Sequence, residues 1–287
     1  MQGFYNVIKP TGVSSAYVVS KIKKITREKR VGHMGTLDPA ASGVLTIAVG
    51  KATRFFDYFL NKDKHYFAIA EFGVQTDTLD SEGNILINDP FVVSESDIKN
   101  KLSKFIGEIE QCPPIYSAVN INGKRAYELA RLGENIDMPI RKVNVYDFQL
   151  VYKISDNKYA FRVHCSAGTY IRTLLSDLAN SLGTVANVPV IIREGSGNFF
   201  LNNASTLDEI KDNFENKLIK IEDVIKLKQI NFKDSDVKSV LNGVKIKNRY
   251  DLYNGEEFLG YVNNKLFGLF ACDDGQLLCK INLYEGE

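Results

Sequence analysis

The chain has 287 residues, of which 44% are hydrophobic and 25% are charged, and its formal net charge is +1. These values are ordinary for a chain that folds around its own core, and they exclude a disordered or fibrous protein. The balanced charge also excludes a uniformly basic coat for nucleic acid.

The first third of the chain predicts a helix followed by a strand. Ser14 precedes apolar residues that recur at helical spacing as far as Ile25, which indicates an N-capped amphipathic helix. The apolar and aromatic run at 66–74 predicts a buried strand. A polar stretch follows, and Glu82-Gly83 within it is a turn signal.

The middle of the chain predicts two helices and then two strands. Residues 94–106 begin with a capping box and continue with apolar residues at helical spacing. Residues 124–132 predict a shorter helix between loops. Strands are expected at 143–154, where apolar residues alternate, and at 158–165.

The last third predicts two more helices and a small β domain. The helix at 168–182 keeps its leucines on one face, and Gly183 is its expected C-terminal stop. A second helix is expected at 207–214. Residues 228–287 read as short strands, which makes the whole chain compatible with an α+β fold. The turn signals in this domain are Asn242-Gly243, Asn254-Gly255 and Asp274-Gly275.

The spacing of the cysteines and the hydropathy of the chain indicate in which cellular compartment the protein works and whether it binds a metal ion. The four cysteines lack the spacing of a zinc site, so we expect reduced thiols and no bound metal. No apolar run reaches the length of a signal peptide or a membrane span. We therefore expect a cytoplasmic protein that does not contact a membrane.

A basic run at 21–30 begins in the second half of the first predicted helix and continues past its end. It holds six basic side chains and one acid. A run of this kind is ordinarily a solvated helix face. It also suits contact with phosphates, which would make binding depend on salt concentration.

The most informative stretch is 31–43, with the sequence VGHMGTLDPAASG. Its glycines let the backbone turn sharply and approach a ligand closely, and it places the imidazole of His33 near the carboxylate of Asp38. Because Pro39 follows, Asp38 fits a helix cap before an N-terminal proline as well as it fits a catalytic group. No Gly-Lys-Ser/Thr follows, which excludes a P-loop.

Seven segments, in order along the chain, resemble the motifs of the bacterial tRNA pseudouridine-55 synthases, the TruB family. The stretch at 31–43 resembles the motif around that family's catalytic aspartate. The other six are KPTGVSS at 9–15, KHY at 64–66, QTDTLD at 75–80, PPIYSA at 113–118, GKRAY at 123–127 and CSAGTYIRT at 165–173.

The resemblance implies a catalytic domain over 1–227, built on a mixed, largely antiparallel sheet flanked by helices, with Asp38 as the catalytic carboxylate. Pseudouridine formation breaks the N1 glycosidic bond of a uridine, rotates the uracil and rejoins it through C5. No redox agent or group donor is consumed, so no cofactor is expected. The carboxylate either attacks C1′ as a nucleophile or removes the proton at C2′, and the sequence leaves both roles open.

By the same resemblance, five further residues serve the substrate. Arg172 would aim the catalytic aspartate through its planar guanidinium, although it also fits an exposed residue early in a helix. Tyr66 would stack on the target uracil, Tyr170 would contact the substrate, and Ile191 would line the base pocket. Tyr66 and Ile191 fit ordinary core positions too. His33 would position the flipped nucleotide, or would be only a structural residue.

The resemblance also predicts how RNA is bound. The partner would be the T-arm stem-loop of tRNA, bound by a monomer, with the target base extruded from its loop. An insertion at about 110–140 would grip the RNA, and 228–287 resembles a small PUA-type RNA-binding domain. The basic residues expected to contact RNA are Lys9, Lys21, Lys24, Lys64, Lys124 and Arg125.

The chain departs from the family at 191–194, where Ile-Ile-Arg-Glu replaces Leu-Arg-Arg-Thr, and this weakens any RNA contact there. Two other functions stay open: a non-catalytic RNA-binding or chaperone protein, and a pseudouridine synthase for another RNA or one guided by a separate RNA. Binding alone does not require Asp38 and Arg172, which favours an enzyme.

Overall fold

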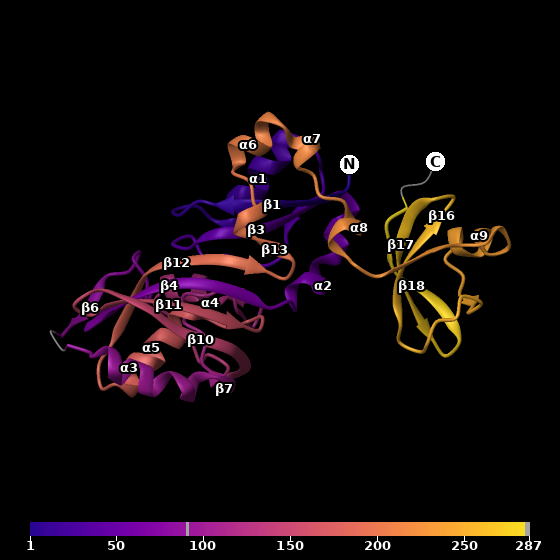
Figure 1. The fold of residues 1–287 in the computed structure, drawn as a ribbon. Coiled ribbons are helices and arrows are strands. Elements are labelled where there is room, and N and C mark those ends of the chain that lie inside the picture. Colours follow the sequence, from indigo (N-terminus) through magenta and orange to yellow (C-terminus); the bar gives the residue numbers. More distant parts are fainter. Residues whose placement is uncertain (90–91, 285–287) are drawn as a thin grey trace.

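The computed structural model describes residues 1–89 and 92–284. They form a large α+β body and a small β body, which follow one another along the chain (Figure 1). The C-terminal domain expected from the sequence extends to 287, so its last three residues lie outside the described part.

A nine-stranded sheet forms the centre of the large body. Its main path runs in the order β1 (Gly3–Lys9), β3 (Ser42–Val49), β12 (Ala186–Ser196), β4 (Lys64–Phe72), β11 (Lys158–Cys165), β10 (Arg141–Ser155) and β7 (Gly107–Gln111). Two short strands complete it: β2 (Val31–His33) pairs with β3, and β13 (Phe199–Phe200) pairs with β12. Only β12 and β3 run parallel among these pairs in the described residues. The mixed, largely antiparallel sheet is therefore confirmed.

Three predicted helices flank this sheet. α1 (Ser15–Thr26) is capped by the side chain of Ser14, as its sequence pattern indicates. α3 (Glu95–Leu102) lies beside β10, and α5 (Ile171–Ser181) packs its row of buried leucines on β12 and β4. All three predictions are confirmed, because apolar side chains at helical spacing have a sheet to pack against.

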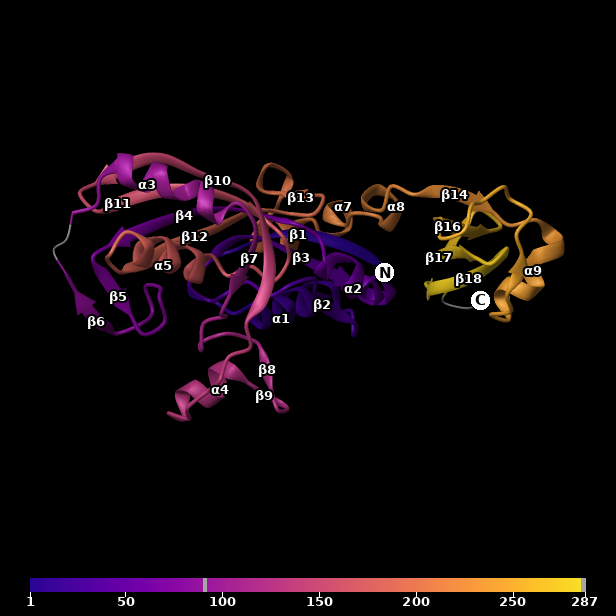
Figure 2. The same ribbon diagram turned by 90° about the horizontal axis from the view of Figure 1, so that it is seen from below.

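An insertion between β7 and β10 projects from the large body (Figure 2). It contains β8 (Asn120–Ile121), β9 (Lys124–Arg125) and α4 (Ala126–Arg131). The predicted helix at 124–132 therefore starts two residues late, since Lys124 and Arg125 pair with β8 first. Val119, Ala126 and Met138 form its small core, and Tyr170 packs against them.

Short elements connect these parts. The predicted helix at 207–214 ends at Asp212, and a separate turn of helix follows it. The remaining elements of the large body are η1 (Gly50–Phe55), α2 (Phe56–Leu60), β5 (Val74–Thr76), β6 (Ile85–Asn88), η2 (Ser103–Phe105), η3 (Leu201–Asn203), α6 (Leu207–Asp212), α7 (Phe214–Lys217) and α8 (Ile221–Val224).

The small body is a five-stranded sheet with the order β14 (Lys228–Asn231), β16 (Glu257–Val262), β17 (Lys265–Asp273), β18 (Gln276–Asn282) and β15 (Ile246–Lys247). The turn signal at Asp274-Gly275 is confirmed: both residues have positive φ and join β17 to β18. Asn242-Gly243 instead ends α9 (Asp234–Leu241), a helix that the turn signals did not predict.

The two bodies share apolar contacts. Leu259 and Leu269 of the small sheet belong to one cluster with Phe55 and Phe59 of the large body. This packing fixes the small sheet beside η1 and α2. Among the described residues, no helix has the length and apolar character needed to cross a membrane.

Candidate active site

Asp38 lies in the loop that joins β2 to β3. No helix follows it, and β3 begins at Ser42 after a turn closed by the Ala41 amide and the Asp38 carbonyl. The helix-cap interpretation of Asp38 is therefore wrong. Its side chain is 35% exposed, so the carboxylate is open to a ligand.

Arg193 on β12 fixes the loop that carries Asp38. Its guanidinium is buried and donates to three carbonyl oxygens, those of Val44 (2.7 Å), Thr36 (2.9 Å) and Gly35 (3.3 Å). Gly43 permits this approach, because a Cβ there would lie 2.3 Å from the Arg193 carbonyl oxygen. Sequence analysis missed this role, although Arg193 is the one arginine retained at 191–194.

The side chain of Arg172 on α5 contacts three other segments of the chain. Its Nη2 atom donates to Asp38 Oδ2 at 2.6 Å and to the Tyr116 carbonyl at 3.1 Å. Its Nη1 atom donates to the Thr78 carbonyl at 2.9 Å and lies 3.3 Å from Asp80 Oδ2. The side chain is only 3% exposed, so these contacts hold the guanidinium in one position from which it pairs with Asp38. The predicted pairing of Arg172 with Asp38 is thus present.

Asp80 is the second carboxylate of this network and was missed by sequence analysis. It is buried, and its Oδ1 accepts hydrogen bonds from Thr78 Oγ1 (2.6 Å) and the Glu82 amide (3.0 Å). A buried guanidinium needs a compensating charge, and Asp80 supplies one from the inner side. Its position at the end of the 75–80 segment was the available signal.

A cavity of about 250 Å³ opens beside the Asp38 carboxylate. Tyr66, Tyr170, Arg172 and Ile191 all line it with Asp38, so the structure brings together five of the six residues predicted to act on the substrate. Its walls combine aromatic and aliphatic surface with the Asp38–Arg172 pair and with the basic residues Lys64, Arg141 and Arg193. Such a lining suits a flat, weakly polar ring held next to a charged group.

Both tyrosines present neutral rings to the cavity. Burial raises the pKa of Tyr66 to about 12, against an opposing effect of Arg193. Burial likewise raises the pKa of Tyr170. The Tyr170 backbone is held by the Gln111 side chain through two hydrogen bonds, of 2.7 and 3.1 Å. These rings can therefore stack on a base but do not bring charge to it.

His33 does not line the cavity. It lies at the end of β2, and its buried Nδ1 finds no hydrogen-bond partner among the described residues. Burial lowers its pKa, and the positive charge of Arg193 lowers it further. A neutral imidazole outside the cavity is not placed for acid–base work, and the positioning role of His33 stays a prediction.

The basic residues predicted to contact RNA fall into two groups. Lys24 on α1, and Lys124 and Arg125 on β9, are exposed, and Lys21 is half-buried with its ammonium 5.1 Å from the ring centre of Tyr17. These four side chains lie at the surface on elements that could meet a phosphate backbone.

Lys9 and Lys64 are different, because both are buried. Lys9 is 0% exposed and its Nζ donates to the carbonyls of Pro10, Val13 and Pro39, so the prediction that it contacts RNA is wrong. It ties the N-terminal motif to the Asp38 loop. Lys64 donates to the carbonyls of Leu60 and Lys62, and burial lowers its pKa to about 8. It lines the cavity instead of the outer surface.

Comparison with known proteins identifies the family to which the chain is similar. Residues 23–171 match the model of the TruB family pseudouridylate synthase N-terminal domain. A protein named tRNA pseudouridine synthase B from Caldanaerobacter subterraneus subsp. tengcongensis is 38% identical over 93% of this chain and 93% of its own length. A protein of the same name from Staphylococcus aureus (strain JH9) is 40% identical, over 97% of this chain and 93% of its own length.

Solved structures share the fold. A chain in the structure of an H/ACA RNP bound to a substrate RNA containing 2′-deoxyuridine aligns with a TM-score of 0.73, over 98% of this chain and 85% of that chain. The identity is 24%, a level at which the likeness concerns the fold.

Proposed function

This chain belongs to the TruB family of pseudouridylate synthases, and we propose that it isomerises uridine 55 in the T arm of tRNA with Asp38 as the catalytic carboxylate. It is a tRNA pseudouridine synthase, as its relatives are named. The observation that carries the assignment of Asp38 is its pairing with Arg172 at 2.6 Å beside a cavity lined by tyrosines.

Asp38 is placed for work at the sugar. Cleavage of the N1 glycosidic bond builds positive charge at C1′, which an adjacent carboxylate stabilises. Asp38 then either bonds to C1′ or takes the proton from C2′ to give a glycal. In both cases one carboxylate is enough, because the uracil is kept and not released. No electrons or groups are transferred to a second molecule, so the chemistry needs no cofactor.

Tyr66, Tyr170 and Ile191 keep the detached uracil in the cavity. Stacking on an aromatic ring is worth about 1–3 kcal/mol per base, and a neutral phenol does not compete for the charge on Asp38. The Ile191 side chain adds an apolar surface to the cavity wall. The base can thus rotate in place and present C5 to C1′ without escaping.

The target base has to leave its stack to enter a cavity of about 250 Å³. We propose that residues 1–227 form the catalytic domain. The surrounding RNA would be bound by α1, by the insertion at about 110–140 and by a PUA-type domain at 228–287. Lys21, Lys24, Lys124 and Arg125 would meet phosphates, and binding would weaken as salt rises. We propose that the chain acts as a monomer in the cytoplasm, where tRNA is matured.

A purely RNA-binding protein is not favoured, because binding has no use for a buried Arg172 that aims a carboxylate into a cavity. The test is tritium release from a T-arm stem-loop in which every uridine carries tritium at C5. We expect one tritium released per stem-loop, and none when uridine 55 is replaced by cytidine. Release from other positions would reject the choice of uridine, and mapping pseudouridine in total RNA with and without the gene would show which RNA is modified.

A further inference from the structure

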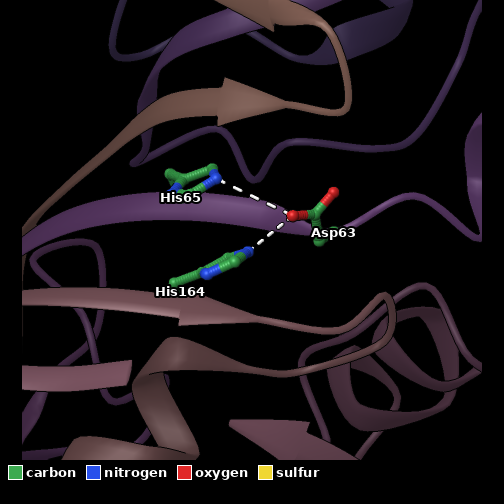
Figure 3. Close-up of side chains that lie close together, drawn as sticks. All are labelled: Asp63, His65 and His164. Atoms are coloured by element: carbon green, nitrogen blue, oxygen red, sulfur yellow. Dashed lines mark hydrogen bonds and ion pairs between the residues drawn. The ribbon is translucent and has the colours of Figure 1, made fainter. Parts of the chain in front are cut away.

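A cluster of two histidines and one aspartate lies away from the cavity (Figure 3). His65 on β4 and His164 on β11 are directly paired in the strand register. Asp63 lies directly before β4, two residues from His65, and its carboxylate is close to both imidazoles. In Figure 3 both imidazole rings turn toward the Asp63 carboxylate.

The cluster is on the opposite face of the sheet from the cavity. Side chains alternate along a strand, and Lys64 and Tyr66, on either side of His65, line the cavity. His164 lies between Val163 and Cys165, both of which are buried in the core. The cluster is therefore separate from the machinery assigned to the isomerisation.

We propose that Asp63, His65 and His164 bind one divalent transition-metal ion, with zinc as the best fit. Imidazole nitrogens and a carboxylate oxygen are ligands that zinc prefers. The three ligand atoms lie within 4.8 Å of one another. The Nε2 atoms of His164 and His65 stand 2.5 and 3.8 Å from Asp63 Oδ2.

Binding of an ion requires the three side chains to move. Bonds of roughly 2.0–2.2 Å place tetrahedral ligand atoms about 3.3 Å apart, so the carboxylate shifts away from His164 by roughly 1 Å. The rings are stacked with centroids 4.0 Å apart and 12° between their planes, and they rotate about Cβ–Cγ until both planes meet the ion. The three side chains are 32–38% exposed, so water can reach the ion and complete its coordination.

Neighbouring residues fix the backbone of Asp63 and pack beside the two imidazole rings. The Gly197 amide donates to the Asp63 carbonyl at 3.0 Å, which fixes the backbone of that ligand. The Phe200 ring lies 5.6 Å from His65, and the Tyr146 ring lies 4.8 Å from His164. Gly195 makes this packing possible, since a Cβ there would lie 2.7 Å from Phe200 and 3.3 Å from His65. The cysteine pattern gave no sign of the site, whose ligands Asp63 and His164 are 101 residues apart.

The test uses the full chain with the two exposed thiols removed by C112S and C279S, so that cysteine does not bind metal. Zinc is titrated by calorimetry after treatment with chelator, and cobalt(II) replaces it for absorption spectroscopy. We expect one ion per chain and visible cobalt bands of four- or five-coordinate geometry. H65N and H164N should each weaken binding at least about tenfold, whereas H33N, at the remaining histidine, should leave it unchanged.

NMR of the same protein guards against variants that misfold. Zinc should shift the ring-proton signals of His65 and His164 and leave those of His33 in place. Zinc should also raise the melting temperature of the parent and leave that of H164N unchanged. Binding that survives both H65N and H164N, or histidine signals that do not respond to zinc, would overturn the proposal.

Discussion

The Nη2 atom of Arg172 lies 2.6 Å from Oδ2 of Asp38, and this contact joins residues that are 134 positions apart in the chain. The pair is asymmetric, because the guanidinium is buried while the carboxylate reaches the cavity. A loop without regular structure therefore presents its carboxylate in a fixed direction, with one side held by protein and the other facing the substrate. This preorganisation is what the chemistry at C1′ requires.

The first prediction concerns the charge of Asp38. D38N keeps the shape of the side chain but removes its capacity to act as nucleophile or base. We expect kcat for tritium release to fall at least about 10³-fold, the size of effect seen when a group that stabilises a transition state is lost. Binding of the stem-loop, measured by filter retention, should persist. Release at the wild-type rate would remove Asp38 from the mechanism.

The second prediction concerns the planar fork of Arg172. R172K keeps the positive charge, but an ammonium cannot serve Asp38, Asp80 and two backbone carbonyls at once. Misplacement of the carboxylate by about 1 Å should lower kcat roughly 10²-fold. Single-turnover kinetics measure this, and the Michaelis constant should change little.

A matched control is R162K. Arg162 is exposed on β11 and pairs with Glu194 at 3.3 Å on the outer face of the sheet. We expect its kcat to match the wild type and its free energy of unfolding to change by less than about 0.5 kcal/mol. Equal losses in R172K and R162K would show a general effect of arginine replacement.

The third prediction concerns Arg193, which positions the Asp38 loop and is given no role in the reaction itself. Arg193 holds the Asp38 loop through the carbonyls of Gly35 and Thr36, and it holds the start of β3 through the carbonyl of Val44. R193K leaves at least one of these buried acceptors unpaired, which should cost about 1–3 kcal/mol of stability. We expect kcat to fall while the Michaelis constant for the stem-loop stays, with urea unfolding as the second measurement. An unchanged kcat would mean that the loop keeps its shape without this arginine.

Sequence reasoning predicted the local parts of this molecule well. Ser14 and Ser94 cap the helices they were expected to cap, and Gly183 ends α5 with φ of 78°. These features depend on neighbours within a few residues, so spacing is enough to reveal them. The residues around the cavity, Ile191 included, followed from their place in recognisable motifs.

The features that escaped prediction depend on distant partners. Lys9 carries a charge, so its sequence suggested a phosphate contact, yet three backbone carbonyls enclose it in the core. The role of Arg193 follows from the side-by-side placement of β3 and β12, the parallel pair in the sheet, and that of Asp80 from its pairing with Val188 on β12 and its contact with Arg172 on α5. Strand order of this kind is set by packing across the whole domain and leaves little trace in local periodicity.

The fourth prediction uses the pKa of His33, which burial and then the charge of Arg193 lower below its usual 6.5. The unfolded chain binds this proton near pH 6.5, while the folded chain binds it only at lower pH. Stability due to neutral His33 is therefore complete above pH 6.5 and is lost as pH falls below it. We expect the free energy of unfolding to drop more between about pH 7.5 and 5 in the wild type than in H33Q. Parallel curves for the two proteins would contradict this assignment.

The last prediction asks whether the ring of Tyr66 or its hydroxyl holds the uracil. Burial keeps the phenol neutral, with its pKa raised to about 12, so the hydroxyl brings no charge and the ring face carries the stacking. In a D38N background, which prevents turnover, Y66L should weaken stem-loop binding by about 1–3 kcal/mol, or about 5- to 150-fold. Y66F keeps the ring and should bind within about twofold of the parent.

Tyr146 provides the matched control, because it is an exposed tyrosine on β10 whose ring lies 4.8 Å from His164 on the outer face of the sheet. Y146L removes an aromatic ring of the same size from a surface that is away from the cavity, so stem-loop binding should not change. If Y66F lost as much affinity as Y66L, the hydroxyl would be the group that holds the base. If Y66L bound as tightly as the parent, the uracil would be retained by Tyr170 and Ile191 without a stack on Tyr66.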